Sequence, residues 1–372
     1  MSATDARRGR APETAAGPLD AGVGPSPSVE PSGFQPGPPE RIGVLGAGSW
    51  GTALAQLLAL KGHRVRLWCH DPGVAVTIND GRTSSYLPGI DLHPALRAVT
   101  DVSAAVADAG VVLSASPSQF VGAIMVRAAD HLPPDALLVS ASKGIELGTL
   151  RRMDEVIGAV VPARAMRRFC VLSGPSFAGE VADGMPTAVV IAGRTPEAAS
   201  EAQRVFQTST FRVYTNTDVV GVELAGAVKN VIALAAGVAA GLGFGHNTTA
   251  ALITRGLAEI TRLGVAMGAR HATFYGLAGM GDLVLTCTGS ASRNRTVGYR
   301  LGRGEALEDI LSDMHAVAEG VRNSAAVHEL ARREGVEMPI TEEVHAIIHR
   351  GRSPLDALTA LMRRDPKPED WS

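Results

Sequence analysis

The chain has 372 residues, a length that suggests two domains rather than a single core. Its formal net charge of −2 gives no overall attraction to nucleic acid or to an anionic membrane. The three cysteines, Cys69, Cys170 and Cys287, are far apart and match neither a metal-ligand nor a disulfide spacing, so we predict no metal site and a reducing compartment, the cytoplasm.

The first forty residues differ in composition from the rest of the chain. Proline, glycine, alanine and serine dominate residues 1–40, and no hydrophobic periodicity is present. Such a segment cannot bury enough apolar surface to offset the entropy lost on ordering, so we predict a disordered tail. A targeting peptide is the alternative, but the segment lacks the apolar central region of a secretory signal.

A glycine-rich turn follows the tail. An apolar strand leads into Gly-Ala-Gly-Ser-Trp-Gly at residues 46–51, a helix is expected over 52–61, and a second apolar strand comes after it. In such a unit Gly46 permits the tight turn, Gly48 lets the backbone approach a pyrophosphate, and Gly51 allows the helix to pack closely on the strand. The helix N-terminus then offers free N–H groups to the phosphates. The pattern predicts a dinucleotide site.

Strands and helices alternate up to about residue 215. This alternation is typical of a mostly parallel sheet with helices on both faces, so we predict an α/β, Rossmann-type, doubly wound domain over residues 41–215. Beyond the first strand, the expected strands cover residues 65–69, 98–100, 111–114, 137–140, 170–173, 188–192 and 211–214.

The character of the sequence changes at Asn216. A long helical run covers Val219–Ala240, and no strand is expected after it. We predict an all-helical domain over residues 216–366 that carries substrate-binding and catalytic groups. The alanine-rich stretch 231–242 is too short to cross a bilayer, and no membrane span is predicted.

Lys229 lies in the middle of this helical run, where nearly every neighbour is small or apolar. A helix that is apolar on all sides is buried, and a buried lysine needs a partner or a lowered pKa. Either condition suits acid–base chemistry, and a structural lysine paired inside a bundle is the alternative. Glu223 and Asn230 share a neighbouring face and could anchor the helix or frame a site.

Two polar segments follow this helix. The segment 279–282 is a glycine-flanked break that projects the carboxylate of Asp282, for which an N-cap is the alternative role. Ser-Arg-Asn-Arg at 292–295 combines a guanidinium with hydroxyl and amide groups, which suits a phosphate or carboxylate, although a solvated basic turn has the same composition. Arg300 and Arg303 could extend it toward nucleic acid, but aromatic residues and excess charge are lacking, so we predict no nucleic-acid partner.

Two loops of the first domain follow predicted strands. Lys143 lies in Ser-Lys-Gly at 142–144, at the carboxyl edge of the sheet where ligands of such folds bind. The loop at 173–180 contains a Gly-Pro-Ser turn that could present backbone N–H groups to a ligand. An ordinary strand–helix connection is the alternative.

The end of the second strand bears on the choice of cofactor. An NAD site usually has an acidic side chain there, which holds the ribose 2′-hydroxyl. Here the strand ends at His70, and Asp71 follows. Alternation places Arg66 and His70 on the same side, where they could cradle a 2′-phosphate. We predict that NADP(H) is preferred and that NAD(H) is also accepted.

Together these motifs resemble the bacterial-type NAD(P)-dependent glycerol-3-phosphate dehydrogenases, which reduce dihydroxyacetone phosphate to sn-glycerol 3-phosphate, the backbone of glycerophospholipids. The resemblance extends from about Arg41 to Arg350. It is carried, in family order, by the segments 46–52, 86–90, 142–144, 173–180, 223–230, 279–283, 292–295 and 319–322.

The resemblance implies a set of site residues and a homodimer. It implies that Lys229 is the proton donor and acceptor, and that Lys143, Gly174, Ser176, Lys229, Asp282, Ser292, Arg293 and Asn294 bind the substrate. It implies that the cofactor contacts the glycine-rich turn, including Ser49 and Trp50, and also His70, Lys143, Ala178, Arg293, Val317 and Glu319. The family often has threonine where this chain has Ser176 and Asn323.

Two rival functions stay open from the sequence. A sibling enzyme of the same architecture would act on a hydroxy acid, and the arginine would then hold a carboxylate. A non-catalytic sensor would bind reduced NADP and pass the signal to a partner. The buried lysine argues against the sensor, because sensing needs no proton donor.

Overall fold

The computed structural model describes residues 38–314, 318–366 and 368–369. The predicted disordered tail therefore lies outside the described residues except at its end. There, the backbone N–H of Glu40 donates to Nδ1 of His63, and its carbonyl accepts from the N–H of Arg64. Glu40 is thus hydrogen-bonded to the start of β2.

The described part of the chain contains one eight-stranded sheet, in the order β3-β2-β1-β4-β5-β6-β7-β8. Six of its seven strand pairings are parallel, and the pairing of β6 with β7 is antiparallel. The strands are β1 (Arg41–Leu45), β2 (Arg64–Trp68), β3 (Leu96–Val99), β4 (Val111–Ser114), β5 (Leu137–Ser140), β6 (Phe169–Ser173), β7 (Thr187–Gly193) and β8 (Phe211–Asn216).

The prediction of a mostly parallel, Rossmann-type sheet is confirmed, with a strand at each expected position. The reversal at β7 was not expected. The connection from β6 to β7 holds only the short helix α6 (Ala178–Ala182), and α6 packs on α1 (Ser49–Leu60). Antiparallel neighbours need no long crossover, so a short connection is sufficient here.

Alternate residues of the strands enter two cores, one on each face of the sheet. On β4, for example, Val111 and Leu113 belong to one core and Val112 to the other. The first core is covered by α1, α2 (Pro72–Gly81) and α7 (Pro196–Phe206). The second is covered by α3 (Val102–Val106), α4 (Ser118–Ala129) and α5 (Met153–Gly158), near the turn η1 (Ala165–Arg168). Each fully buried aliphatic side chain contributes about 1.5–3 kcal/mol.

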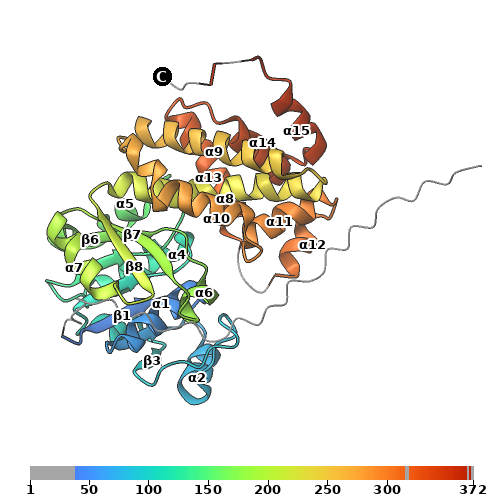
Figure 1. Cartoon of the computed structure of the whole chain (residues 1–372). Helices are drawn as coiled ribbons and strands as arrows, with labels where there is room; N and C mark the ends of the chain where they lie inside the picture. The colour runs from blue at the N-terminus through green and yellow to red at the C-terminus, as the bar shows by residue number, and fades with distance from the viewer. Residues whose placement is uncertain (1–37, 315–317, 367, 370–372) are drawn as a thin grey trace, which may run out of the picture. The chain divides into compact units, whose positions relative to one another are not determined.

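The second core continues from the sheet into the helices after Asn216, drawn from yellow to red in Figure 1. The prediction that this region is all helical is confirmed. Its elements are α8 (Val219–Gly241), α9 (His246–Ala266), the turns η2 (His271–Tyr275) and η3 (Leu277–Gly281), α10 (Asp282–Thr288), α11 (Arg293–Gly302), α12 (Leu307–Ser312), α13 (Glu319–Arg333), α14 (Pro339–Arg350) and α15 (Pro354–Met362).

Helix α8 is the centre of this region, because α9, α10, α11, α13 and α14 all pack against it. It is long and apolar enough to cross a membrane, but 89% of its most apolar window is buried inside the protein. It is therefore a core helix. Asp218 caps its first turn by accepting the N–H of Gly221, and Glu223 accepts the N–H of Asp154 and so anchors α8 to α5.

Helices α8 and α11 approach until their backbones touch. A Cβ atom added at Gly237 would lie 2.1 Å from the carbonyl oxygen of Arg295, and one added at Gly298 would lie 2.1 Å from that of Leu234. A Cβ at Gly302 would similarly meet the carbonyl of Val238. The two helices therefore run in the same direction, and α11 begins beside the middle of α8. We call this contact the glycine seam.

Candidate active site

The glycine-rich turn has the predicted mechanical form. Gly46 has φ of +123°, which favours glycine, and an added Cβ would lie 2.9 Å from the backbone of Ala115 after β4. At Gly51 an added Cβ would lie 1.9 Å from the carbonyl oxygen of Gly46. At Gly48 the space is open. The turn lies between β1 and β4, where the strand order reverses and where such folds bind nucleotides.

The residues at this turn suit a dinucleotide. Helix α1 begins at Ser49, and no side chain caps its N-terminus, so its first N–H groups are available to an anion. Within the described residues, Nε1 of Trp50 is buried and has no hydrogen-bond partner. A buried donor without a partner is costly, and a bound polar group would relieve that cost. Ala178 lies on α6, which packs against α1.

The prediction that Arg66 and His70 together cradle a 2′-phosphate at the end of β2 is wrong for Arg66. The guanidinium of Arg66 donates to Asp108 at 2.6 Å and to the carbonyl of Ala104, so it faces the amino end of the sheet and is not part of a phosphate cradle. His70 is exposed. The carboxylate of Asp71 accepts the N–H of Gly73 at 2.7 Å and caps α2. A cavity of about 480 Å³, lined in part by Asp71, adjoins this end of the strand.

A buried cluster of charged side chains joins the sheet to the helices. Nζ of Lys229 on α8 donates to Oδ1 of Asp282 at 2.5 Å and to Oγ1 of Thr286 at 2.8 Å. Nζ of Lys143, from the loop after β5, donates to Oδ2 of the same Asp282 at 2.6 Å. Two lysines from different parts of the chain thus share one carboxylate, and Lys229 is only 7% exposed.

Burial and neighbouring charges set the protonation of this cluster. Burial lowers the pKa of Lys229 to about 8; Asp282 opposes that shift and the ammonium of Lys143 adds to it. Burial alone would raise the pKa of Asp282, but the two ammonium groups outweigh burial and hold that pKa below its ordinary value. Lys229 can therefore exchange a proton near neutral pH while Asp282 stays charged.

The loop after β6 lies next to this cluster. Gly174 has φ of +136°, and an added Cβ would lie 2.9 Å from the backbone of Val189. Its carbonyl oxygen accepts from the hydroxyl of Ser176 at 3.1 Å and from Nζ of Lys143 at 3.4 Å. The structure thus brings Lys143, Gly174 and Ser176 together.

The N-terminus of α11 lies beside the same part of α8. Ser292 caps the helix, Arg293 is exposed in the first turn, and Oδ1 of Asn294 accepts the N–H of Gly320. A Cβ at Gly320 would lie 2.8 Å from both the carbonyl oxygen of Asn230 and Oδ1 of Asn294. Asn230 follows Lys229 directly, so the predicted anion-binding turn adjoins the lysine.

Glu319, at the first turn of α13, lies close enough to the lysine cluster and to Arg293 for their charges to affect its pKa. Burial raises its pKa to about 7, while Arg293, Lys143 and Lys229 act in the opposite direction. Val317, the other cofactor residue that the resemblance implies in this segment, lies outside the described residues.

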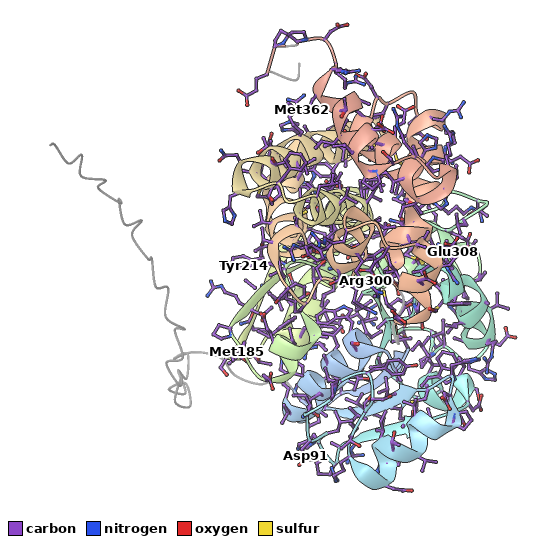
Figure 2. All side chains as sticks on the ribbon, turned by 90° about the vertical axis from the view of Figure 1, so that its right-hand side faces the viewer. Asp91, Met185, Tyr214, Arg300, Glu308 and Met362 are labelled. Carbon is purple, nitrogen blue, oxygen red and sulfur yellow. The ribbon has the colours of Figure 1, made fainter. Side chains whose placement is uncertain are left out.

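The sequence reasoning missed Thr286, which contacts Lys229. The signal was present, because Asp282 and Thr286 are four residues apart and share one face of α10. Arg300, considered above for nucleic acid, pairs with Glu305 at 2.6 Å and Asp313 at 2.8 Å on the surface of the helical region (Figure 2). These ion pairs remove it from a basic patch.

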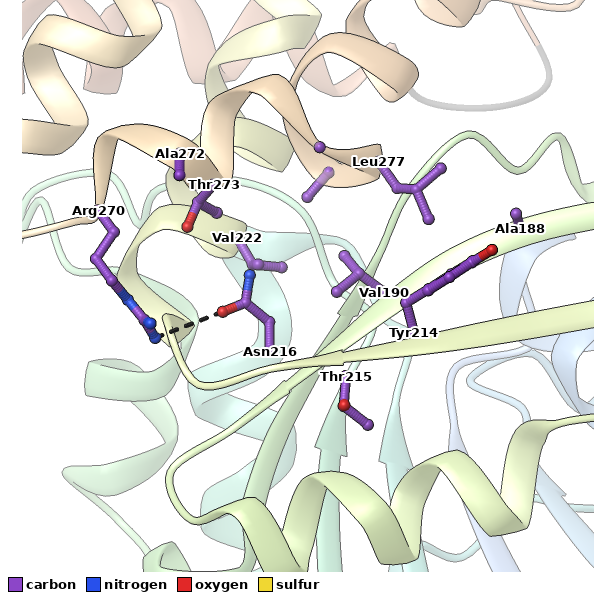
Figure 3. Close-up of a pocket in the computed structure, with 12 residues that line it drawn as sticks. Ala188, Val190, Tyr214, Thr215, Asn216, Val222, Arg270, Ala272, Thr273 and Leu277 are labelled. Carbon is purple, nitrogen blue, oxygen red and sulfur yellow. Dashed lines mark hydrogen bonds between the residues drawn. The ribbon is translucent and has the colours of Figure 1, made fainter.

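A second cavity of about 480 Å³ lies between strands β7 and β8 and the turns η2 and η3 (Figure 3). Its lining includes Tyr214, Leu277 and Asn216, and Asn216 accepts a long hydrogen bond of 3.5 Å from Arg270. None of the predicted site residues lines it. Within the described residues, no cluster of three or more His, Cys, Asp or Glu side chains could hold a metal ion.

Comparisons with known proteins show which family has this sequence and fold. Residues 41–199 match a sequence profile described as NAD-dependent glycerol-3-phosphate dehydrogenase N-terminus, and residues 218–359 match the profile for its C-terminus. The chain belongs to the NAD-dependent glycerol-3-phosphate dehydrogenases. Enzymes of this family interconvert dihydroxyacetone phosphate and sn-glycerol 3-phosphate with a nicotinamide cofactor, and the predicted enzyme class is confirmed.

Similar dehydrogenases are found among curated bacterial proteins. Glycerol-3-phosphate dehydrogenase [NAD(P)+] of Geobacter sulfurreducens is 56% identical over 333 residues, 89% of this chain and 99% of that protein. The Nitratidesulfovibrio vulgaris protein of the same name is 52% identical over 330 residues, 88% of this chain and 100% of that protein. Both names give NAD(P)+ as the cofactor without a preference.

Solved structures of glycerol-3-phosphate dehydrogenases have the same fold. The enzyme from Coxiella burnetii is 38% identical and aligns with a TM-score of 0.83 over 88% of this chain and 99% of that one. A D-mandelate dehydrogenase with bound NADH also aligns, with a TM-score of 0.59, over 85% of this chain and 99% of that one. At 13% identity that likeness concerns the fold alone, so it does not favour the rival hydroxy-acid function.

Proposed function

We propose that this glycerol-3-phosphate dehydrogenase uses Lys229 as the proton donor in ketone reduction and as the proton acceptor in the reverse direction. The observation that carries the proposal is the cluster of Lys229, Asp282 and Lys143, where a buried ammonium with a lowered pKa is held at a fixed position. A positioned acid of this kind is typically worth ~10²–10⁴ in rate.

When bound, the nicotinamide supplies the hydride that adds to the ketone carbon. The carbonyl oxygen takes the electron pair of its broken π bond, and Lys229 transfers a proton to that oxygen and becomes neutral. Asp282 holds the ammonium of Lys229 in position before the transfer. Lys143, on the other oxygen of Asp282, keeps the cluster positively charged, which suits an anionic substrate.

We propose that the phosphate is bound at the first turn of α11. Arg293 would give charge and a bidentate fork, Ser292 and Asn294 neutral groups, and the helix N-terminus free N–H groups. Gly174 and Ser176 would face the substrate from the loop after β6. Because α11 begins beside Lys229, phosphate binding there would hold the ketone close to the proton donor.

We propose that the dinucleotide binds along the glycine-rich turn, with Gly46, Gly48, Ser49, Trp50 and Gly51 at the pyrophosphate. His70 would lie at the adenosine end, with Ala178, Lys143, Arg293, Val317 and Glu319 toward the nicotinamide. The open space at Gly48 and the unpartnered Nε1 of Trp50 support this placement.

NADP(H) is the proposed preferred cofactor. Two observations support it without Arg66. The carboxylate of Asp71 already accepts the backbone N–H of Gly73, and the exposed imidazole of His70 offers a ring N–H to a 2′-phosphate. The test is kcat/KM for NADPH and NADH in the wild type and in His70→Ala. A clear preference of the wild type for NADH would identify Asp71 as the ribose ligand instead.

The division into a tail, a dinucleotide-binding domain (41–215) and a helical domain (216–366) stays a proposal, as do the cytoplasmic location and the homodimer. The homodimer rests on the family resemblance alone, and light scattering on the purified protein tests it.

The decisive experiment for the proposed function follows NADPH absorbance after addition of dihydroxyacetone phosphate. Unphosphorylated ketones and keto acids serve as comparison substrates. Faster turnover of a keto acid would favour the hydroxy-acid enzyme, and the absence of any ketone-dependent oxidation would favour the sensor.

A further inference from the structure

Asn323, on α13, lies between the two segments that carry the active-site lysines. It is 1% exposed. Its Oδ1 accepts the backbone N–H of Ile145 at 2.8 Å, and its Nδ2 donates to the carbonyl of Ala227 at 2.7 Å. Ile145 is two residues after Lys143, and Ala227 is two residues before Lys229. One carboxamide therefore links the Lys143 loop to the Lys229 turn of α8.

The Lys143 loop has little freedom on its other sides. Gly144 has φ of +149°, and an added Cβ would lie 2.4 Å from Oγ of Ser118 on α4. The stem of Lys143 runs along α8, where a Cβ at Gly226 would lie 3.4 Å from its Cγ. The loop is thus enclosed by α4 and α8. The side chain of Asn323 joins the loop to α13 through Ile145, and it joins α13 to α8 through Ala227.

We propose that Asn323 is a positioning residue for the reaction: its carboxamide fixes the Lys143 loop against the Lys229 turn and so determines how both ammonium groups share the carboxylate of Asp282. Neither oxygen of that carboxylate is bound by both lysines, because Lys229 takes Oδ1 and Lys143 takes Oδ2. A small movement of the loop would therefore remove Lys143 from the cluster without displacing Lys229.

Such a movement has a predictable electrostatic effect. The ammonium of Lys143 is one of the causes of the lowered pKa of Lys229, and Asp282 acts in the opposite direction. If Lys143 moves away, Lys229 keeps the carboxylate and loses the repulsion, so its pKa rises. The pH at which reduction slows and the pH at which oxidation begins would both move upward.

The test compares Asn323→Ala with a matched control, Ser324→Ala. Ser324 is the next residue on α13 and is fully buried, and its hydroxyl donates to the carbonyl of Val321 at 2.7 Å and contacts His349, away from the lysines. Both variants should lower the melting temperature. Only Asn323→Ala should raise the apparent pKa of the kcat profile, by about 1 unit for both reduction and oxidation. At pH 7 this should lower kcat for oxidation about tenfold, because the neutral fraction of Lys229 falls, and should leave kcat for reduction nearly unchanged.

Asn323→Thr covers the case in which the alanine variant does not fold. A threonine hydroxyl can make one of the two hydrogen bonds, so this variant should fold and shift the profile by a smaller amount in the same direction. Wild-type profiles in the folded Asn323 variants, or an equal shift in Ser324→Ala, would overturn the proposal.

A double variant tests whether Asn323 acts through Lys143. If it does, Asn323→Ala should cause no further shift of the profile in a Lys143→Met background. An additive shift would mean that Asn323 acts by another route and would also overturn the proposal.

This inference rests on Lys229 as the proton donor, and the two can fail separately. If Lys229→Met retains wild-type kcat, the proposed function fails. If Lys229→Met loses activity while the Asn323 variants keep wild-type profiles, only the positioning role fails.

Discussion

Replacing Lys229 by methionine removes the proposed proton donor while keeping the length of its side chain. The change deletes the contacts of Nζ with Asp282 at 2.5 Å and with Thr286 at 2.8 Å. Asp282 still has Lys143 at 2.6 Å, so no isolated charge is left in the core. The loss of stability should therefore stay below the 3–5 kcal/mol, roughly, of an uncompensated buried charge.

The effect on catalysis should be much larger than the effect on folding. With a pKa of about 8, roughly nine-tenths of the Lys229 side chains are protonated at pH 7, so nearly all of the wild-type enzyme carries its acid. Loss of a positioned acid should lower kcat by ~10²–10⁴, which is about 2.7–5.5 kcal/mol in the activation barrier. Binding of NADPH should change little, because the glycine-rich turn is built from other residues.

The assay is NADPH oxidation under saturating dihydroxyacetone phosphate, together with NADPH binding by fluorescence and a melting curve. Lys143→Met is the control, because it removes the other lysine from the same carboxylate. A folded Lys229→Met protein with near wild-type kcat would refute the mechanism, and Lys143 would become the candidate donor.

Three further predictions concern phosphate binding, the pH dependence of kcat and the pH dependence of stability. Arg293→Lys should raise KM for dihydroxyacetone phosphate strongly, since lysine lacks the bidentate fork, and an unchanged KM in steady-state kinetics would move the phosphate site toward Lys143. Reduction needs protonated Lys229 and oxidation needs the neutral form, so kcat for reduction should fall and kcat for oxidation should rise as pH increases through about 8. The pKa of Lys229 is lowered from 10.5 to about 8, so between these two pH values the folded state binds fewer protons at Lys229 than the unfolded state does. The contribution of Lys229 to the free energy of unfolding should therefore rise with pH over this range. Urea unfolding of the wild type and Lys229→Met between pH 8 and about 10 measures that difference, and an equal pH dependence of the two would contradict the lowered pKa.

Local patterns in the sequence were enough to predict the strands, the glycine-rich turn and the need of Lys229 for a partner or a lowered pKa. The structure has both the partner and the lowered pKa. The identity of the partner, Asp282, could not be derived from spacing, because 53 residues separate the two in the chain. The same holds for Asn323, whose two hydrogen bonds join segments that are distant in sequence.

The error at Arg66 has a specific cause. Alternation predicts only the side of a strand on which a side chain lies, and the ring of His70 does lie near that of Trp68, two residues after Arg66. Four residues of extended chain, however, place Arg66 and His70 ~13 Å apart along the strand. The guanidinium of Arg66 pairs with Asp108, which also pairs with Arg41 at the start of β1, so it lies away from the end of β2. The reversal of β7 was also missed, because the sequence of a strand does not show whether it will pair parallel or antiparallel with its neighbour.

The glycine seam has a consequence for how this enzyme can vary. Along the contact of α8 and α11 a single added carbon at Gly237, Gly241, Gly298 or Gly302 would fall within 2.4 Å of a backbone oxygen of the other helix. No rotamer change can relieve that overlap, so the helices would have to separate, and the separation would move the turn of α11 away from Lys229. These four positions touch no reacting group, yet a library of random variants should show them to be as intolerant of alanine as the lysine itself. Efforts to alter substrate choice should therefore change the loops after β5 and β6, which lie beside the lysine cluster, and leave the distance between the two helices as it is.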